Sequence, residues 1–277
     1  MRVRFWGVRG TLPTPGPGTV RFGGNTPCID ILTSDQERII IDAGTGIRNL
    51  GADLSRSASG DIRATLLLSH THWDHIQGLP FFEPLLGRRN SFKIVGPRRF
   101  SLSLEETVAR QFLEPYLPFA YRSLAAEMKV IEKEAGETLR ISRNVMVRTA
   151  GMKHPGGCLG FRIENNGVVF AYCTDTAHVD DTFTEGVLEL AEGADLLIHD
   201  AHFRNLKLAQ MFDDWGHSSW EQAVQVAIEA KVRTLALFHY APEVSDEEVD
   251  SIVVEARRFF PRTLAAREGL ILDLPLG

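Results

Sequence analysis

Short apolar runs bounded by turn residues recur along the whole chain, and this pattern predicts β-strands. The run Ala64–Leu68 is continuous, as in a strand that is buried on both faces. Asn165-Asn-Gly167 is typical of a two-residue hairpin turn. The other expected strands are Val3–Trp6, Cys28–Leu32, Arg38–Ile41, Phe92–Val95, Met128–Glu132, Val145–Thr149, Leu159–Glu164, Val168–Tyr172, Asp195–Ile198, Leu235–Phe238 and Gly269–Leu274.

Helix start signals lie between these runs. Three capping boxes, in which Ser is followed three residues later by Glu, begin at Ser103, Ser218 and Ser245, and apolar residues at helical spacing follow each. Shorter helices are expected to end at Leu50 and to span 187–192. Two strand-rich blocks, each followed by helices and joined without a linker, predict one α/β domain over residues 1–277, a four-layer αβ/βα sandwich with helices outside two mixed sheets.

Composition narrows the class of protein. Of 277 residues, 44% are hydrophobic and 24% charged, as in ordinary globular proteins. The net charge of −6 argues weakly against a general binder of polyanions. Three dispersed cysteines suggest a reducing compartment, and no run of 18 apolar residues is present. We therefore expect a soluble cytoplasmic protein without a membrane partner; a homodimer is left open.

Residues that can bind a metal ion are concentrated just after the Ala64–Leu68 run. His70, His72, Asp74 and His75 fall within six residues. Neutral imidazole and carboxylate are ligands of Zn²⁺ and similar cations. Residues two apart in an extended segment point the same way, so His70 and His72 can hold one ion while Asp74 and His75 hold a second.

This segment resembles the His-x-His-x-Asp-His signature of the metallo-β-lactamase-fold hydrolases. The family pattern also calls for a His, an Asp and a His at later strand ends, and the chain has His154, Asp175 and His239 there. The resemblance implies two divalent ions, with zinc expected and manganese or iron as alternatives. It assigns His70, His72 and His154 to one ion, Asp74, His75 and His239 to the other, and Asp175 to both as a bridge; Asp74 is also expected to take part in catalysis.

Two further segments resemble the ribonuclease Z and cyclic phosphodiesterase branch. Leu196–His202 is similar to a His-Glu-Ala-Thr element, with Asp200 in the place of Glu, and 215–219 is similar to a second element that contains His217. The resemblance implies that His217 is a general acid oriented by Asp200. The alternative for His217 is a structural contact at a helix N-terminus.

Other polar residues have less definite roles. Asp42 is expected to orient the first metal-binding segment. The long loop 7–24 is predicted to lack secondary structure and, by the same resemblance, to lie beside the metals, where Arg9 and Arg21 either meet a phosphate or are solvated. The aromatic segment 112–121 is either a wall of the substrate site or a cover over the core.

The expected activity is hydrolysis of a phosphodiester by a metal-activated hydroxide. A small or cyclic nucleotide or ribose phosphodiester is the first prediction, because the chain is acidic and has no long Gly/Pro/Lys-rich insertion to grip RNA. Nucleic acid is a less favoured partner, and the corresponding alternative is a ribonuclease Z-like nuclease acting on RNA 3′ ends or oligonucleotides. A di-iron oxidoreductase and a metal-free binding module are alternatives from other classes.

Overall fold

The computed structural model describes the chain except residues 58–59, 99–101, 119, 179–184 and 276–277. The described residues form two seven-stranded sheets. The first has the order β14 (Ile271–Asp273), β1 (Arg2–Gly7), β2 (Cys28–Leu32), β3 (Arg38–Ile41), β4 (Arg63–Leu67), β5 (Ser91–Pro97) and β6 (Glu127–Lys133). The second has the order β13 (Thr263–Ala265), β12 (Leu235–Phe238), β11 (Leu196–Asp200), β10 (Val168–Cys173), β9 (Cys158–Asn165), β8 (Val145–Met152) and β7 (Thr138–Arg140).

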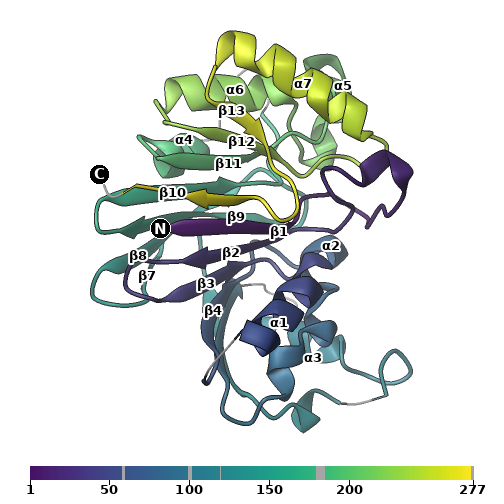
Figure 1. The fold of residues 1–277 in the computed structure, drawn as a ribbon, viewed down its shortest axis with the longest axis vertical. Helices are drawn as coiled ribbons and strands as arrows, with labels where there is room; N and C mark the ends of the chain where they lie inside the picture. The colour runs from purple at the N-terminus through teal and green to yellow at the C-terminus, as the bar shows by residue number, and fades with distance from the viewer. Residues whose placement is uncertain (58–59, 99–101, 119, 179–184, 276–277) are drawn as a thin grey trace.

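Helices cover the outer face of each sheet (Figure 1). The first sheet carries α1 (Gly46–Ser57) and α3 (Leu104–Arg110), and the second carries α4 (Glu185–Ala191), α6 (Trp220–Glu229) and α7 (Asp246–Phe259). Figure 1 shows the four layers in sequence, with the sheets face to face. The predicted αβ/βα sandwich is confirmed. None of the described helices is both long and apolar enough to cross a membrane.

Apolar packing explains this arrangement. The sheets meet through fully buried rings, with Phe5 of β1 6.4 Å and Tyr172 of β10 5.8 Å from the ring of Phe238 of β12. A second core lies under α1 and α3, where Leu50 and Leu104 belong to the same apolar cluster as Leu66 of β4. Because β4 is buried on both sides after Arg63, its sequence does not alternate between apolar residues and exposed polar ones, and its single further polar residue, Thr65, is buried too.

The direction of the strands determines where the predicted site residues lie. β3 to β6 are parallel to one another, and so are β10 to β13. Parallel strands present their carboxyl ends at one edge of a sheet, where α/β proteins bind ligands. The predicted site residues lie at these edges: His70 follows β4, Asp175 follows β10, Asp200 ends β11 and His239 follows β12.

The three cysteines are free and buried.

Several sequence predictions were wrong in detail. The second capping box begins at Ser219, which pairs with Gln222, and not at Ser218. The Ser218 hydroxyl instead donates to the carbonyl of Thr176 at 2.5 Å, and Glu221 accepts from the backbone of Leu206. Glutamine caps as well as glutamate, so two overlapping boxes were present in the sequence.

Other boundaries also moved. Helix α1 runs to Ser57 and not to Leu50, because Leu54 adds another buried contact. The loop 7–24 contains a 3₁₀ turn, η1 (Pro17–Thr19), and an isolated bridge from Arg9 to Tyr240. The short elements β7, β13 and α5 (Leu206–Met211) were not predicted, since three to six residues carry too little periodicity to detect.

Candidate metal centre and active site

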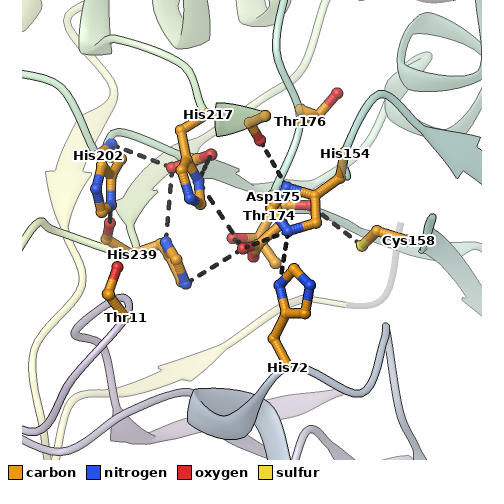
Figure 2. Close-up of polar contacts among 12 residues, drawn as sticks. Thr11, His72, His154, Cys158, Thr174, Asp175, Thr176, His202, His217 and His239 are labelled. Carbon is orange, nitrogen blue, oxygen red and sulfur yellow. Dashed lines mark hydrogen bonds and ion pairs between the residues drawn. The ribbon is translucent and has the colours of Figure 1, made fainter. Parts of the chain in front are cut away.

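The predicted ligands converge from both sheets on one edge of the molecule. His70 and His72 follow β4, and Asp74 and His75 lie in the short helix α2 (Trp73–Ile76). The second sheet supplies the remaining three from the segments after β8, β10 and β12, namely His154, Asp175 and His239. Figure 2 shows His72 approaching from the first half of the chain and His154, Asp175 and His239 from the second.

The side chains fall into two groups with a shared carboxylate. His70, His72 and His154 have ligand atoms within 4.8 Å of one another, and so do Asp74, His75 and His239. The Asp175 carboxylate lies between the groups, 3.8 Å from His154 Nε2 on one side and 3.3 Å from His75 Nε2 on the other. The structure therefore brings all seven predicted residues together, although other combinations, such as His70 with His75 and Asp175, are equally close.

In two places, nitrogen atoms of two histidine rings lie within hydrogen-bond distance of each other. His154 Nε2 lies 3.0 Å from His72 Nδ1, and His75 Nε2 lies 3.2 Å from His239 Nε2. The buried Nε2 of His70 has no hydrogen-bond partner among the described residues. Burial lowers the pKa values of His70, His72 and His154, which leaves these imidazoles neutral with lone pairs available. Such a donor set fits divalent cations.

The cluster also contains two negatively charged side chains, Asp74 and Asp175. Burial alone would raise the pKa of Asp74 and Asp175, but the adjacent rings of His75 and His239 outweigh burial and hold both values below the ordinary range. Both carboxylates are therefore ionised. Buried ionised groups require a compensating charge, and bound cations would supply it in place of the imidazole protons.

Asp42 organises the first half of the site, as predicted. Its carboxylate accepts from Ser69 N at 2.8 Å and from the Tyr172 hydroxyl at 2.7 Å, and it lies 2.8 Å from His75 Nδ1. These contacts fix the orientation of the His75 ring so that Nε2 points to Asp74 and Asp175. A carboxylate behind a metal-binding imidazole raises its basicity and sets its tautomer.

Three site residues have left-handed backbone conformations. Asp42, Asp175 and His239 follow strands and have φ values of 60°, 55° and 61°. Residues other than glycine rarely adopt this region, and such strain is concentrated at functional sites. The sharp turn at each strand end lets the next side chain point across the edge of the sheet.

His217 and Asp200 form the predicted pair. Asp200 Oδ2 lies 3.0 Å from His217 Nδ1 and accepts from Ser218 N at 3.2 Å, while Oδ1 accepts from His202 N at 3.1 Å. The shorter side chain of aspartate therefore reaches the imidazole. Burial lowers the pKa of His217, but the charge and hydrogen bond of Asp200 outweigh it and raise the pKa. The ring holds a proton beside Asp175, 3.8 Å from its carboxylate.

His202, to which the sequence analysis gave no role, is a neighbour of His217. Its ring stacks on that of His217, with centroids 4.2 Å apart and planes 16° apart, and its Nδ1 lies 3.2 Å from the carbonyl of His239. The spacing Asp200-x-His202 at a strand end was the available signal. His178 and His199 pair with each other instead, with their Nε2 atoms 3.2 Å apart.

The two arginines do not face a substrate. Arg9 is fully buried, where it donates to the carbonyls of Gly23 and Val244 and lies 3.3 Å from Asp246. Arg21 is half exposed and pairs with Asp250 at 2.6 Å. Arg9 therefore neither meets a phosphate nor is solvated, whereas Arg21 is a solvated charge, the second of the two alternatives; acidic residues of α7, distant in sequence, bind both guanidinium groups.

The loop 7–24 does lie beside the site. The backbone N–H of Thr11 donates to Asp74 Oδ2 at 2.8 Å. Gly10 lies so close to His239 that a Cβ there would come within 2.4 Å of its Nδ1. The segment 112–121 is divided: Phe112 is buried in the core beside Tyr121, whereas Tyr116 is 79% exposed, and residue 119 lies outside the described residues.

Comparisons with known proteins show what this chain is similar to in sequence and in fold. A family model described as the beta-lactamase superfamily domain matches residues 37–240. A protein named ribonuclease Z from Synechococcus sp. (strain CC9311) is 40% identical over 99% of this chain and 99% of its own. In fold, the chain is similar to the metallo-beta-lactamase fold protein YhfI from Bacillus subtilis (18% identity, TM-score 0.70, 98% of each chain). It is also similar to the short form of human tRNase Z (19% identity, TM-score 0.71, 99% of this chain and 100% of that chain).

Proposed function

Because the chain belongs to the beta-lactamase superfamily, in its ribonuclease Z-like branch of metal-dependent hydrolases, we propose that it is a nuclease that cleaves phosphodiesters near RNA 3′ ends. The observation that carries the proposal is the seven-residue cluster placed beside the His217–Asp200 pair. The ribonuclease name of a relative aligned over 99% of both chains supports this alternative better than the small phosphodiester that the sequence favoured.

The seven clustered residues would hold two divalent ions. Ions held there would supply activation of a water molecule and offset negative charge on the attacked phosphate. Asp42 fixes the ring of His75, and the Thr11 N–H fixes one oxygen of Asp74, so the ligand set needs little rearrangement. Pre-oriented groups lower the barrier because they avoid reorganisation during the reaction.

His217 would protonate the leaving oxygen. Asp200 binds Nδ1, so the other ring nitrogen, Nε2, is free to face the substrate with its proton. The Asp200 carboxylate raises the pKa of His217 and so favours the protonated ring. After cleavage, the neutral ring can take a proton from solvent and return to the starting state.

A small or cyclic phosphodiester is the second candidate substrate, supported by charge. The net charge is −6, and the exposed Asp213 and Asp214 lie only a few residues before His217. Carboxylates at the edge of the site repel a long polyanion more than they repel a substrate with a single phosphate.

One substrate panel with metal quantification tests both candidates. It would contain a precursor tRNA with a 3′ trailer, a single-stranded oligoribonucleotide, 2′,3′- and 3′,5′-cyclic nucleotides, a cyclic ribose phosphate and a thioester control. We expect about two divalent ions per chain and the highest kcat/KM on RNA. Cleavage of the cyclic compounds alone would refute the nuclease, and folded protein without metal under metal-replete conditions would refute both candidates. Iron together with turnover of oxygen or nitric oxide would indicate the oxidoreductase alternative.

A further inference from the structure

A small pocket adjoins the candidate proton donor and has no role in the chemistry described above. It has a volume of about 230 Å³ and lies between α5 and the segments that follow β11 and β12. We call it the aromatic pocket. Its lining includes Phe203, Phe212 and Trp215, with His202 at its inner wall and Arg204 and Glu243 as charged members.

Three rings meet in this pocket. Phe212 and Trp215 have centroids 4.7 Å apart, and Phe203 lies 6.1 Å from Phe212 and 6.4 Å from Trp215. Trp215 remains 53% exposed despite these contacts. Aromatic rings with accessible faces, held in place by other rings, are how proteins stack nucleobases without reading their sequence.

The pocket is tied to the catalytic residues through two connections. His202 lines the pocket, and its ring stacks on His217 at 4.2 Å. Trp215 precedes His217 by two residues, and the carbonyl of the intervening Gly216 lies 2.9 Å from His154 Nδ1. Gly216 has a φ of 81° and would clash with His154 if it carried a Cβ, so the backbone between Trp215 and His217 is closely fitted.

We propose that the aromatic pocket binds the base of the nucleoside whose oxygen leaves during cleavage, an inference that rests on the proposed nuclease function. His217 protonates the leaving oxygen, so the leaving nucleoside lies on the His217 side of the phosphate. On that side, only the ring of His202 lies between His217 and the pocket. Stacking between the base and Trp215 would position the leaving group for proton transfer.

The charged lining suits the edge of a base. Glu243 is exposed and has no ion-pair partner among the described residues, so its carboxylate can accept from an N–H group on a base. Arg204 is held 2.5 Å from Glu248, which leaves its guanidinium half exposed at the rim. A purely apolar occupant would leave the Glu243 carboxylate unused.

Cleavage kinetics of the metal-loaded enzyme provide the first test. Two oligoribonucleotides would carry a single abasic residue, one on the 5′ side of a mapped scissile phosphate, which is the leaving side when the 5′ product ends in a 3′-hydroxyl, and one on the 3′ side. In the native protein, the 5′ abasic residue should lower kcat/KM by about 5- to 150-fold, the range for one stacked base. The 3′ abasic residue should have little effect.

Variants then assign the effect to the pocket. Trp215→Ala should lower kcat/KM on the intact RNA by a similar factor and should no longer distinguish intact RNA from RNA with the 5′ abasic residue. Trp215→Phe should restore the distinction. Met211→Ala is the matched control, because Met211 is 60% exposed in the adjacent α5 and does not line the pocket. An abasic penalty of the same size in Trp215→Ala and the native protein would overturn the proposal.

Binding separates this proposal from the nuclease function. Calorimetry on the metal-loaded protein would compare adenosine 3′-monophosphate with inorganic phosphate. We expect the nucleotide to bind more tightly, and Trp215→Ala to weaken nucleotide binding by about 5- to 150-fold while phosphate binding stays unchanged. If no RNA is cleaved but this difference is found, the nuclease fails and the base pocket stands. Equal nucleotide affinity in both proteins would overturn the pocket, whatever the activity.

Discussion

Two imidazole–carboxylate pairs lie on opposite sides of the site and differ in what their second nitrogen meets. His75 Nδ1 is 2.8 Å from Asp42, and His217 Nδ1 is 3.0 Å from Asp200. His75 is fully buried, and its Nε2 faces Asp74, Asp175 and His239 at 3.2–3.3 Å. His217 keeps 10% of its side chain exposed, and its Nε2 has no hydrogen-bond partner among the described residues.

The same pair of side chains is thus set up for two different tasks. A ring whose free nitrogen points into buried carboxylates is suited to bind a cation, because negative charge and neutral donors surround one point. A ring that remains partly exposed and has a carboxylate behind it is suited to give up a proton. The residue types alone do not distinguish the two; the surroundings of the second nitrogen do.

The largest expected effect comes from removing the carboxylate that lies near both pairs. Asp175→Ala should abolish cleavage of bis-p-nitrophenyl phosphate and reduce metal content below two ions per chain, since Asp175 lies within 3.8 Å of His75 and His217. Asp195→Ala, at the far end of the second sheet, is a control that should lower stability but keep the metal. Full activity in Asp175→Ala would remove its bridging role.

Removing each imidazole should separate the two pairs. His217→Ala should lower turnover of substrates with poor leaving groups by about 10²- to 10⁴-fold, the usual contribution of a general acid, while metal content is retained. His75→Ala should lose metal as well as activity. Elemental analysis of both variants distinguishes them, and loss of metal in His217→Ala would show that we assigned the wrong residue.

Neutralising the orienting carboxylate should have a smaller effect. Asp42→Asn should weaken metal affinity by about 10- to 100-fold, as is usual for groups behind a metal ligand. The change keeps the size of the side chain, so chelator competition measured on folded protein reports the metal site. Unchanged affinity would mean that Ser69 and Tyr172 hold the His75 segment without Asp42.

The smallest effect is a shift of the pH profile. Asp200 raises the pKa of His217, so the protonated ring, and with it turnover of poor leaving groups, should persist above the ordinary range and decline as pH rises through that raised pKa. Asp200→Asn removes the negative charge and should move this decline to lower pH. A profile that does not move would indicate that Asp200 is structural.

The sequence predicted those features of the fold and site that depend on residues close together in the chain. The strands and the polar residues at their ends are encoded in neighbouring residues, and Asp200 and His217 were found because each lies in a short recognisable segment. For Arg9, neither of the two open alternatives matched the buried ion pair, because its partner Asp246 lies 237 positions away. The aromatic pocket was missed for the same reason, since Phe203, Trp215 and Glu243 come from three separate segments.

The contact between the N-terminal loop and the end of β12 has a consequence for folding. The bridge from Arg9 to Tyr240, the fit of Gly10 against His239 and the bond from Thr11 to Asp74 join the beginning of the chain to both halves of the site. Contacts across such separations are slow to form, because loop closure must come first. The site is therefore complete only in a fully assembled molecule. Cations that bind there would shift the folding equilibrium toward that state by mass action, so metal uptake would report that the beginning of the chain has joined both halves of the site.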